Sequence, residues 1–134
     1  MQKIIVIEDE PQMLRNMLTI LELEGYEALG AENGEQGLAA IEQHRPGLVF
    51  CDIMMPGLDG YGLLRQLRAQ PSTSAIPLIF LTARGEKNDM QTGLAMGAEG
   101  YLTKPVVLDD LLSMVRKHLT SQAPKSEARN PKSE

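Results

Sequence analysis

Residues 48–60 read LVFCDIMMPGLDG, and this stretch decides the fold class of the protein. Its first four residues are apolar and too few for a helix, so they predict a short buried strand. Asp52 ends the apolar run, and a Pro-Gly pair marks the loop that follows. Asp59 stands where it can cap the next helix, which we expect over residues 61–69. The stretch therefore predicts a strand, a loop and a helix in that order.

The same unit recurs on both sides of this stretch. Runs rich in Val and Ile alternate with segments in which apolar residues return every three or four positions, as Leu and Met do after Pro11. This alternation predicts an α/β fold, a doubly wound parallel sheet with helices on both faces. We expect five strands, at residues 3–7, 26–31, 48–51, 77–81 and 100–102, and five helices, at residues 13–21, 35–44, 61–69, 86–96 and 108–119.

The length and composition suit one folded domain. The chain has 134 residues, of which 43% are apolar, enough for a single core and little more. The apolar pattern stops near residue 120, and residues 121–134 are rich in Ser, Pro, Lys and Glu. We therefore expect a domain over residues 1–120, followed by a disordered tail or the start of a linker to another domain that this chain lacks.

Composition and patterning also argue against several classes of protein. The apolar runs are far too short to span a bilayer, and no leader pattern opens the sequence, so we expect a cytoplasmic protein without membrane contact. The net charge is -5, and no helix or stripe gathers basic residues, so we expect no direct nucleic-acid binding by this chain. Cys51 is the only cysteine, and its apolar surroundings predict a small buried side chain without a redox role.

Charged and hydroxyl side chains stand where four of the predicted strands end. Glu8 and Asp9 follow the first strand, Asp52 the third, Thr82 the fourth and, one residue further on, Lys104 the fifth. Ligands of open parallel sheets bind beyond the carboxyl ends of the strands, so these residues are expected to converge there. Taken alone, each has an ordinary explanation as a helix-terminal charge, a turn former, a helix cap or a solvent-facing lysine. The functional prediction rests on their joint placement.

Three carboxylates at one edge of a sheet predict a site for a hard divalent cation. Carboxylates held together repel one another, and the site relieves this by raising a pKa or by binding a cation, for which Mg²⁺ is the natural choice. The two histidines, His44 and His118, lie late in their helices and away from this edge, which argues against zinc. With the cation and Lys104 neutralising charge, a phosphoryl group can be transferred in line to an oxygen of Asp52, the nucleophile.

At these positions the sequence closely resembles bacterial receiver domains of response regulators. The matching motifs are Glu8-Asp9, Asp52 within DIMMPGLDG, Thr82 within LTA, and Lys104-Pro105. The resemblance covers roughly residues 1–120. It implies a flavodoxin-like five-stranded sheet in the order 2-1-3-4-5, and a switch of two-component signalling. Asp52 would take its phosphoryl group from a histidine kinase or a histidine phosphotransfer protein, with Mg²⁺ required.

The resemblance also implies how the metal is held. Asp9 and Asp52 look like direct ligands together with the backbone carbonyl of Met54, and Mn²⁺ or Ca²⁺ can substitute for Mg²⁺. Glu8 stands where the family commonly has Asp, so its longer side chain is expected to act mainly through metal-bound water.

Further roles follow from the same resemblance. Thr82, Lys104 and the backbone of Ala83 are expected to bind the phosphoryl group. Thr82 and Tyr101 resemble the switch pair of the family, although Tyr101 is also explained as a half-buried strand aromatic. The bond before Pro105 is expected to be cis. The readout surface would be formed by residues 86–96, 100–102 and 108–119, through which many relatives form homodimers.

Three other functions compete with this interpretation. A phosphatase of the haloacid-dehalogenase type would place a second Asp two residues after the nucleophile, where this chain has Met54. A flavin-binding module would need a phosphate-binding loop after the first strand, where residues 8–10 are all acidic. A receiver-like protein that works without phosphorylation would not need every site position filled. We therefore expect a phosphoacceptor that promotes only its own phosphorylation and dephosphorylation, and no enzyme acting on other substrates.

Overall fold

Five parallel strands form one sheet in the order β2-β1-β3-β4-β5, which confirms the predicted fold class and strand order. The computed structural model describes residues 2–83 and 87–120, except for the side chains of residues 87–89 and 120. Its elements are β1 (Lys3–Ile7), α1 (Pro11–Leu23), β2 (Glu27–Ala31), α2 (Gly34–His44), β3 (Leu48–Asp52), α3 (Gly60–Ala69), β4 (Leu78–Thr82), α4 (Lys87–Ala95), β5 (Gly100–Thr103) and α5 (Leu108–Thr120).

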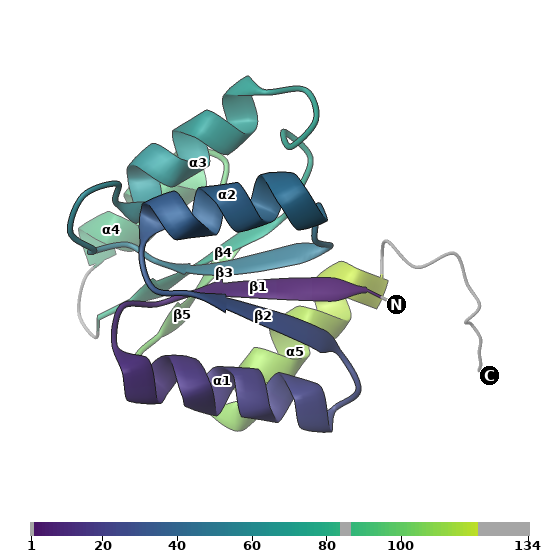
Figure 1. Ribbon diagram of the computed structural model, residues 1–134. Coiled ribbons are helices and arrows are strands. Elements are labelled where there is room, and N and C mark those ends of the chain that lie inside the picture. The colour runs from purple at the N-terminus through teal and green to yellow at the C-terminus, as the bar shows by residue number, and fades with distance from the viewer. Residues whose placement is uncertain (1, 84–86, 121–134) are drawn as a thin grey trace.

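The helices form two layers around the sheet. Helices α1 and α5 cover one face, and α2, α3 and α4 cover the other (Figure 1). The interior strand β1 contributes to both cores, because its successive side chains point to opposite faces. Ile4 and Val6 belong to the core that contains α1 and α5, whereas Ile5 and Ile7 belong to the core that contains residues of α2 and α3. Both faces are therefore apolar, and polar groups gather at the strand ends.

Strands β3, β4 and β5 each extend one residue further than predicted at their carboxyl ends. Asp52 pairs with Leu81 of β4, and Thr82 pairs with Thr103 of β5. The prediction ended these strands at the last apolar residue, but the backbone ladder depends on main-chain groups and continues through a polar residue. Thr103 is likewise the last residue of β5, and not part of the loop. The candidate site therefore begins within the sheet.

The remaining boundary errors have local causes. Strand β2 begins one residue late because the Tyr26 amide donates to Leu21 at the end of α1. Strand β4 begins after Pro77, which has no amide hydrogen to donate. Helices α2 and α3 begin one residue early, directly after their caps Asn33 and Asp59. Helix α1 is longer than its apolar stripe at both ends, and α4 ends at Ala95; the predicted start of that helix at residue 86 lies outside the described residues.

The caps place helix termini next to the strand ends. Pro11 occupies the first turn of α1, as predicted, and the Glu10 side chain accepts hydrogen bonds from the amides of Gln12 (2.9 Å) and Met13 (3.0 Å). Asp59 Oδ1 accepts from the amide of Gly62 at 2.8 Å, so the predicted cap of α3 is present. Cys51 is buried, also as predicted.

Two sequence predictions concern the ends and the membrane. Residues 121–134, predicted to be a tail or linker, lie outside the described residues. Among the helices that the structure describes, none has both the length and the apolar character needed to cross a bilayer.

Candidate functional site

Three carboxylates lie together at the carboxyl edge of the sheet. Glu8 and Asp9 follow β1, and Asp52 ends the neighbouring strand β3. One ligand oxygen from each lies within 4.8 Å of the others, with Glu8 and Asp52 buried and Asp9 exposed. Adjacent parallel strands therefore bring together acidic residues that are far apart in the sequence, as the sequence analysis predicted.

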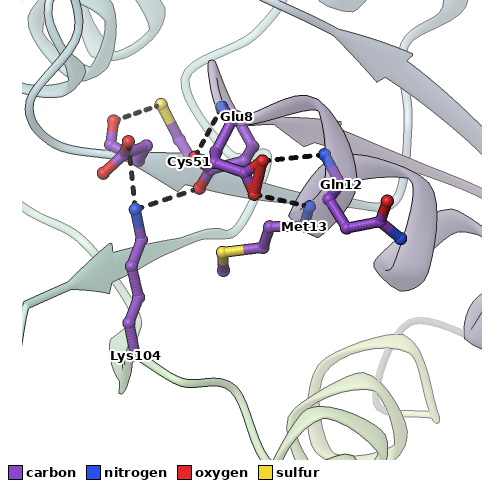
Figure 2. Close-up of polar contacts among 7 residues, drawn as sticks. Glu8, Gln12, Met13, Cys51 and Lys104 are labelled. Carbon is purple, nitrogen blue, oxygen red and sulfur yellow. Dashed lines mark hydrogen bonds and ion pairs between the residues drawn. The ribbon is translucent and has the colours of Figure 1, made fainter.

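Lys104 joins this cluster from the end of β5. Its Nζ atom lies 3.1 Å from Glu8 Oε1 and 3.2 Å from Asp52 Oδ2. Figure 2 shows the lysine side chain pointing across the site toward Glu8. The Lys104 amide donates to the carbonyl of Thr82 at 2.7 Å, and the Lys104–Pro105 bond is cis. A single ammonium group thus bridges two buried carboxylates.

The longer side chain of Glu8 is held by the backbone of the following turn. The carboxylate is fully buried, and its Oε2 accepts a hydrogen bond from the Glu10 amide at 3.0 Å. The Glu8 amide in turn donates to the carbonyl of Ala31 in β2 at 3.0 Å. These contacts fix the Glu8 carboxylate between the start of α1 and Lys104.

Glu10, which the sequence marks only as one of three acidic residues before Pro11, has two contacts in the structure. Its amide binds Glu8, while its side chain caps α1. A glutamate directly before a proline, at the start of an apolar helix, was the available signal for the cap.

Burial and charge shift the pKa values of the three central groups. Burial raises the pKa of the Asp52 carboxyl; Lys104 opposes this increase, and Asp9 adds to it. Burial also raises the pKa of Glu8, against the lowering effect of the Glu10 amide. Burial lowers the pKa of Lys104, but Asp52 and Glu8 together more than offset this, so that its pKa is raised overall. The site thus holds more negative charge than its one ammonium group neutralises.

A cavity of about 480 Å³ opens beside Asp52. Its walls include Met54, Thr82, Ala83 and Lys104, all of them predicted site residues. The Thr82 hydroxyl is buried and has no hydrogen-bond partner within the described part of the chain. A buried hydroxyl without a partner carries an energetic penalty, so this group is available to a ligand that enters the cavity.

Tyr101 lies apart from the carboxylates, on the outer strand β5. It pairs with Phe80 in the strand ladder, and its side chain is 37% exposed. It lines a separate hollow of about 530 Å³ between β5, α4 and α5. The ring therefore lies at the surface that was predicted to transmit the signal, and not in the cavity beside Asp52.

The donor set suits a hard divalent cation. The clustered ligand atoms are all carboxylate oxygens, which Mg²⁺ prefers, and the raised pKa values of Glu8 and Asp52 show that negative charge is disfavoured there. A bound cation would stabilise this negative charge, so the residues present fit the predicted metal.

Comparison with known proteins decides the family. The family model of the response regulator receiver domain matches residues 4–116. The chain belongs to this family. Receiver domains are regulatory phosphoacceptor domains of two-component systems, and they bind Mg²⁺ at an acidic pocket.

Curated relatives of this receiver domain include both short and long proteins. It is 40% identical over 115 residues to the protein PilH of Pseudomonas aeruginosa, covering 86% of this chain and 95% of PilH. It is 43% identical to the probable transcriptional regulator ycf27 of Pyropia yezoensis, with 86% of this chain and 46% of that protein covered. The phosphate regulon transcriptional regulatory protein PhoB of P. aeruginosa is 39% identical, and the match covers 91% of this chain and 54% of PhoB. The chain thus spans about half the length of ycf27 and PhoB.

Solved structures show the same fold. The signal receiver domain of a histidine kinase from Syntrophus aciditrophicus matches with a TM-score of 0.83 and 32% identity, covering 98% of this receiver domain and 99% of that chain. The chemotaxis protein CheY4 of Vibrio cholerae matches with a TM-score of 0.82 and 27% identity, covering 88% of this receiver domain and 98% of CheY4.

Proposed function

We propose that this receiver domain is switched when Asp52 accepts a phosphoryl group from a histidine kinase or a histidine phosphotransfer protein. One observation carries the proposal: the Asp52 carboxylate borders a cavity whose wall also holds the Lys104 ammonium and a buried Thr82 hydroxyl without a described partner. A nucleophile, a cation and a free donor thus border one cavity. The acidic cluster beside them supplies oxygen ligands for a metal ion.

The transfer is a displacement at phosphorus. An oxygen of the Asp52 carboxylate forms the new O–P bond as the N–P bond of the phosphohistidine breaks, and the imidazole nitrogen leaves with the electron pair and takes up a proton. Phosphoryl transfer through a loose transition state asks mainly for positioning and for neutralisation of charge. The domain acts on itself in this scheme, because Asp52 is consumed as the acceptor and does not turn over a separate substrate.

We assign Mg²⁺ to Asp9, Asp52 and the backbone carbonyl of Met54, with Glu8 acting through a metal-bound water. When bound, the cation neutralises charge on the carboxylates and on the incoming phosphoryl oxygens. Mn²⁺ or Ca²⁺ is expected to replace it, since both accept oxygen ligands. The assignment of Glu8 agrees with its contacts to Lys104 and to the Glu10 amide, which occupy both of its oxygens.

The phosphoryl group is expected to change the contacts of three residues. Lys104 exchanges one carboxylate partner for a phosphoryl oxygen, and Thr82 and the Ala83 amide donate to the others. These contacts exist in only one of the two states, so they can shift the equilibrium between them. The movement of Thr82 would draw Tyr101 from its exposed position on β5 toward the interior.

The readout surface in this proposal consists of α4, β5 and α5. Tyr101, Leu94 and Lys117 line a hollow on this surface, so a change in the tyrosine alters its shape. We propose homodimerisation through this surface as one consequence. The absence of direct nucleic-acid and membrane binding, the cytoplasmic location and the role of residues 121–134 stay predictions.

The proposal is tested by intact-protein mass spectrometry after incubation with Mg²⁺ and a small acyl-phosphate donor. We expect one added phosphoryl group in the wild type and none in Asp52→Asn, whose folding is checked by circular dichroism. An unchanged mass in folded wild-type protein would contradict the switch function. Repeated turnover of free phosphate esters would favour the phosphatase alternative, and a yellow purified protein would favour the flavin alternative.

A further inference from the structure

Glu35, the second residue of α2, reaches the loop that follows Asp52. Its Oε2 atom accepts a hydrogen bond from the Leu58 amide at 3.0 Å, across 23 residues of sequence. Leu58 belongs to the loop of residues 53–59, which links β3 to α3. This loop also carries the Met54 carbonyl, the proposed backbone ligand of the metal. A residue outside the acidic cluster is thus bonded to the segment that supplies one of its ligands.

Two glycines allow this close approach. Gly57 has a φ of +77°, and a Cβ atom there would lie 2.9 Å from Glu35 Oε2. A Cβ atom on Gly34 would overlap the carbonyl oxygen of Leu58. The start of α2 and the loop therefore meet backbone to backbone, so the bond to Glu35 lies within a tight contact.

The loop is held at several points around Met54. Ile53 and Met55 are buried in the core between the sheet and the α2, α3 and α4 layer, whereas the Met54 side chain is 71% exposed. The Gly60 amide donates to the Ile53 carbonyl at 2.9 Å. These contacts fix the part of the loop next to β3, and the bond from Leu58 to Glu35 fixes its far end.

We propose that Glu35 is a positioning residue for the metal site, holding residues 54–58 so that the Met54 carbonyl faces the carboxylates. This inference rests on the proposed Mg²⁺ site. It differs from a simple charge effect, because any carboxylate near the site would attract a cation at long range. The two explanations separate when the charge and the hydrogen bond of residue 35 are changed independently.

The test measures the dissociation constant of Mg²⁺ by isothermal titration calorimetry on the full chain. Glu35→Gln keeps an acceptor oxygen at the same reach without the charge, whereas Glu35→Asp keeps the charge on a side chain that is too short. We expect about threefold to tenfold weaker binding for Glu35→Asp and Glu35→Ala, and near wild-type binding for Glu35→Gln, a smaller loss than for direct partners of metal ligands. Glu42→Ala, in the same groove between α2 and α3, is the matched control and is expected to change nothing.

A second measurement follows the hydrogen bond itself. Exchange of the Leu58 amide hydrogen is expected to be faster in Glu35→Ala and Glu35→Asp, and near wild type in Glu35→Gln, with equal melting temperatures showing that the fold is retained. Unchanged Mg²⁺ affinity in Glu35→Ala would overturn the inference, and so would weak binding in Glu35→Gln with normal binding in Glu35→Asp. Absence of Mg²⁺ binding in the wild type would instead overturn the proposed function, and the inference with it.

Discussion

The Nζ atom of Lys104 lies 3.2 Å from Oδ2 of Asp52, and this pair joins two strand ends that are distant in the sequence. Asp52 ends β3, and Lys104 directly follows β5, with β4 between them. The lysine opposes the increase in the Asp52 pKa that burial produces. In the proposed function, Lys104 therefore favours the ionised form of the Asp52 carboxyl and binds the incoming phosphoryl group.

Replacing Lys104 is expected to slow phosphorylation more than it perturbs the fold. Lys104→Met removes the ammonium but keeps an unbranched side chain as far as Cε, and we expect about 100-fold slower phosphorylation, as for the loss of a group that stabilises developing charge. The rate is measured by mass spectrometry over time with a small acyl-phosphate donor. The phosphorylation rate of Lys104→Arg, which keeps the charge, should lie between those of the wild type and Lys104→Met. Equal rates in the wild type and Lys104→Met would show that the lysine has no part in the transfer.

Without divalent cations, the acidic cluster should make stability fall as pH rises. Burial raises the pKa of Glu8 in the folded state above its ordinary value of 4.5. Between pH 4.5 and the raised pKa, the folded state therefore binds more protons than the unfolded state. The contribution is fully present below pH 4.5 and is lost as pH rises through the folded-state pKa.

Glu8→Gln removes this titration. We therefore expect its free energy of unfolding, relative to the wild type, to increase with pH above 4.5, by up to about 1.4 kcal/mol per pH unit. Urea denaturation in EDTA at several pH values measures the difference. A difference that stays constant, or that decreases with pH, would contradict the assigned shift.

Mg²⁺ is expected to stabilise the folded domain. At a free concentration ten times its dissociation constant, the ion adds about 1.4 kcal/mol, which corresponds to about 5 °C in melting temperature for a domain of this size. The increase should be smaller at pH 5 than at pH 7, because protons compete for carboxylates whose pKa values are raised.

Asp9→Asn and Asp52→Asn should each lose most of the Mg²⁺ effect, whereas a distant carboxylate change such as Glu42→Gln should keep it. Differential scanning fluorimetry with and without Mg²⁺ provides the comparison. Equal stabilisation by Mg²⁺ of the wild type and all three variants would mean that the ion binds elsewhere.

Removing the Thr82 hydroxyl should separate stability from switching. The hydroxyl is buried without a described partner, so Thr82→Val is expected to be neutral or to raise the free energy of unfolding by about 1 kcal/mol. The same change removes a donor to the phosphoryl group, so phosphorylation should no longer alter amide exchange in α4, β5 and α5. Thr82→Ser is the control that keeps the donor. A marked loss of stability in Thr82→Val would mean that the hydroxyl is satisfied in the unphosphorylated state.

The sequence was sufficient to predict the sheet because each strand is a short apolar run followed by a turn or a cap. It was also sufficient to predict that Glu8, Asp9 and Asp52 lie close together, because the carboxyl ends of parallel strands meet at one edge of the sheet. It failed at Asp52 and Thr82, which were placed after their strands, since side-chain polarity does not show where main-chain pairing stops.

Other features of the site depend on tertiary structure. The bond from the Leu58 amide to Glu35 joins a loop to a distant helix, and no local pattern marks it. The position of Lys104 at this edge was predicted from the sequence, but its simultaneous contact with Glu8 and Asp52 depends on the fixed positions of the intervening strands.

Phosphorylation of Asp52 is tested most directly by identifying the residue that carries the phosphoryl group. Sodium borohydride reduces an aspartyl phosphate to homoserine and leaves free carboxylates unchanged, so peptide mass spectrometry of reduced, phosphorylated protein locates the modified position. We expect homoserine at position 52 and nowhere else, and only when Mg²⁺ and the phosphoryl donor are both present. Homoserine at another aspartate, or a phosphoryl group retained on a serine, threonine or histidine with position 52 unmodified, would contradict this expectation.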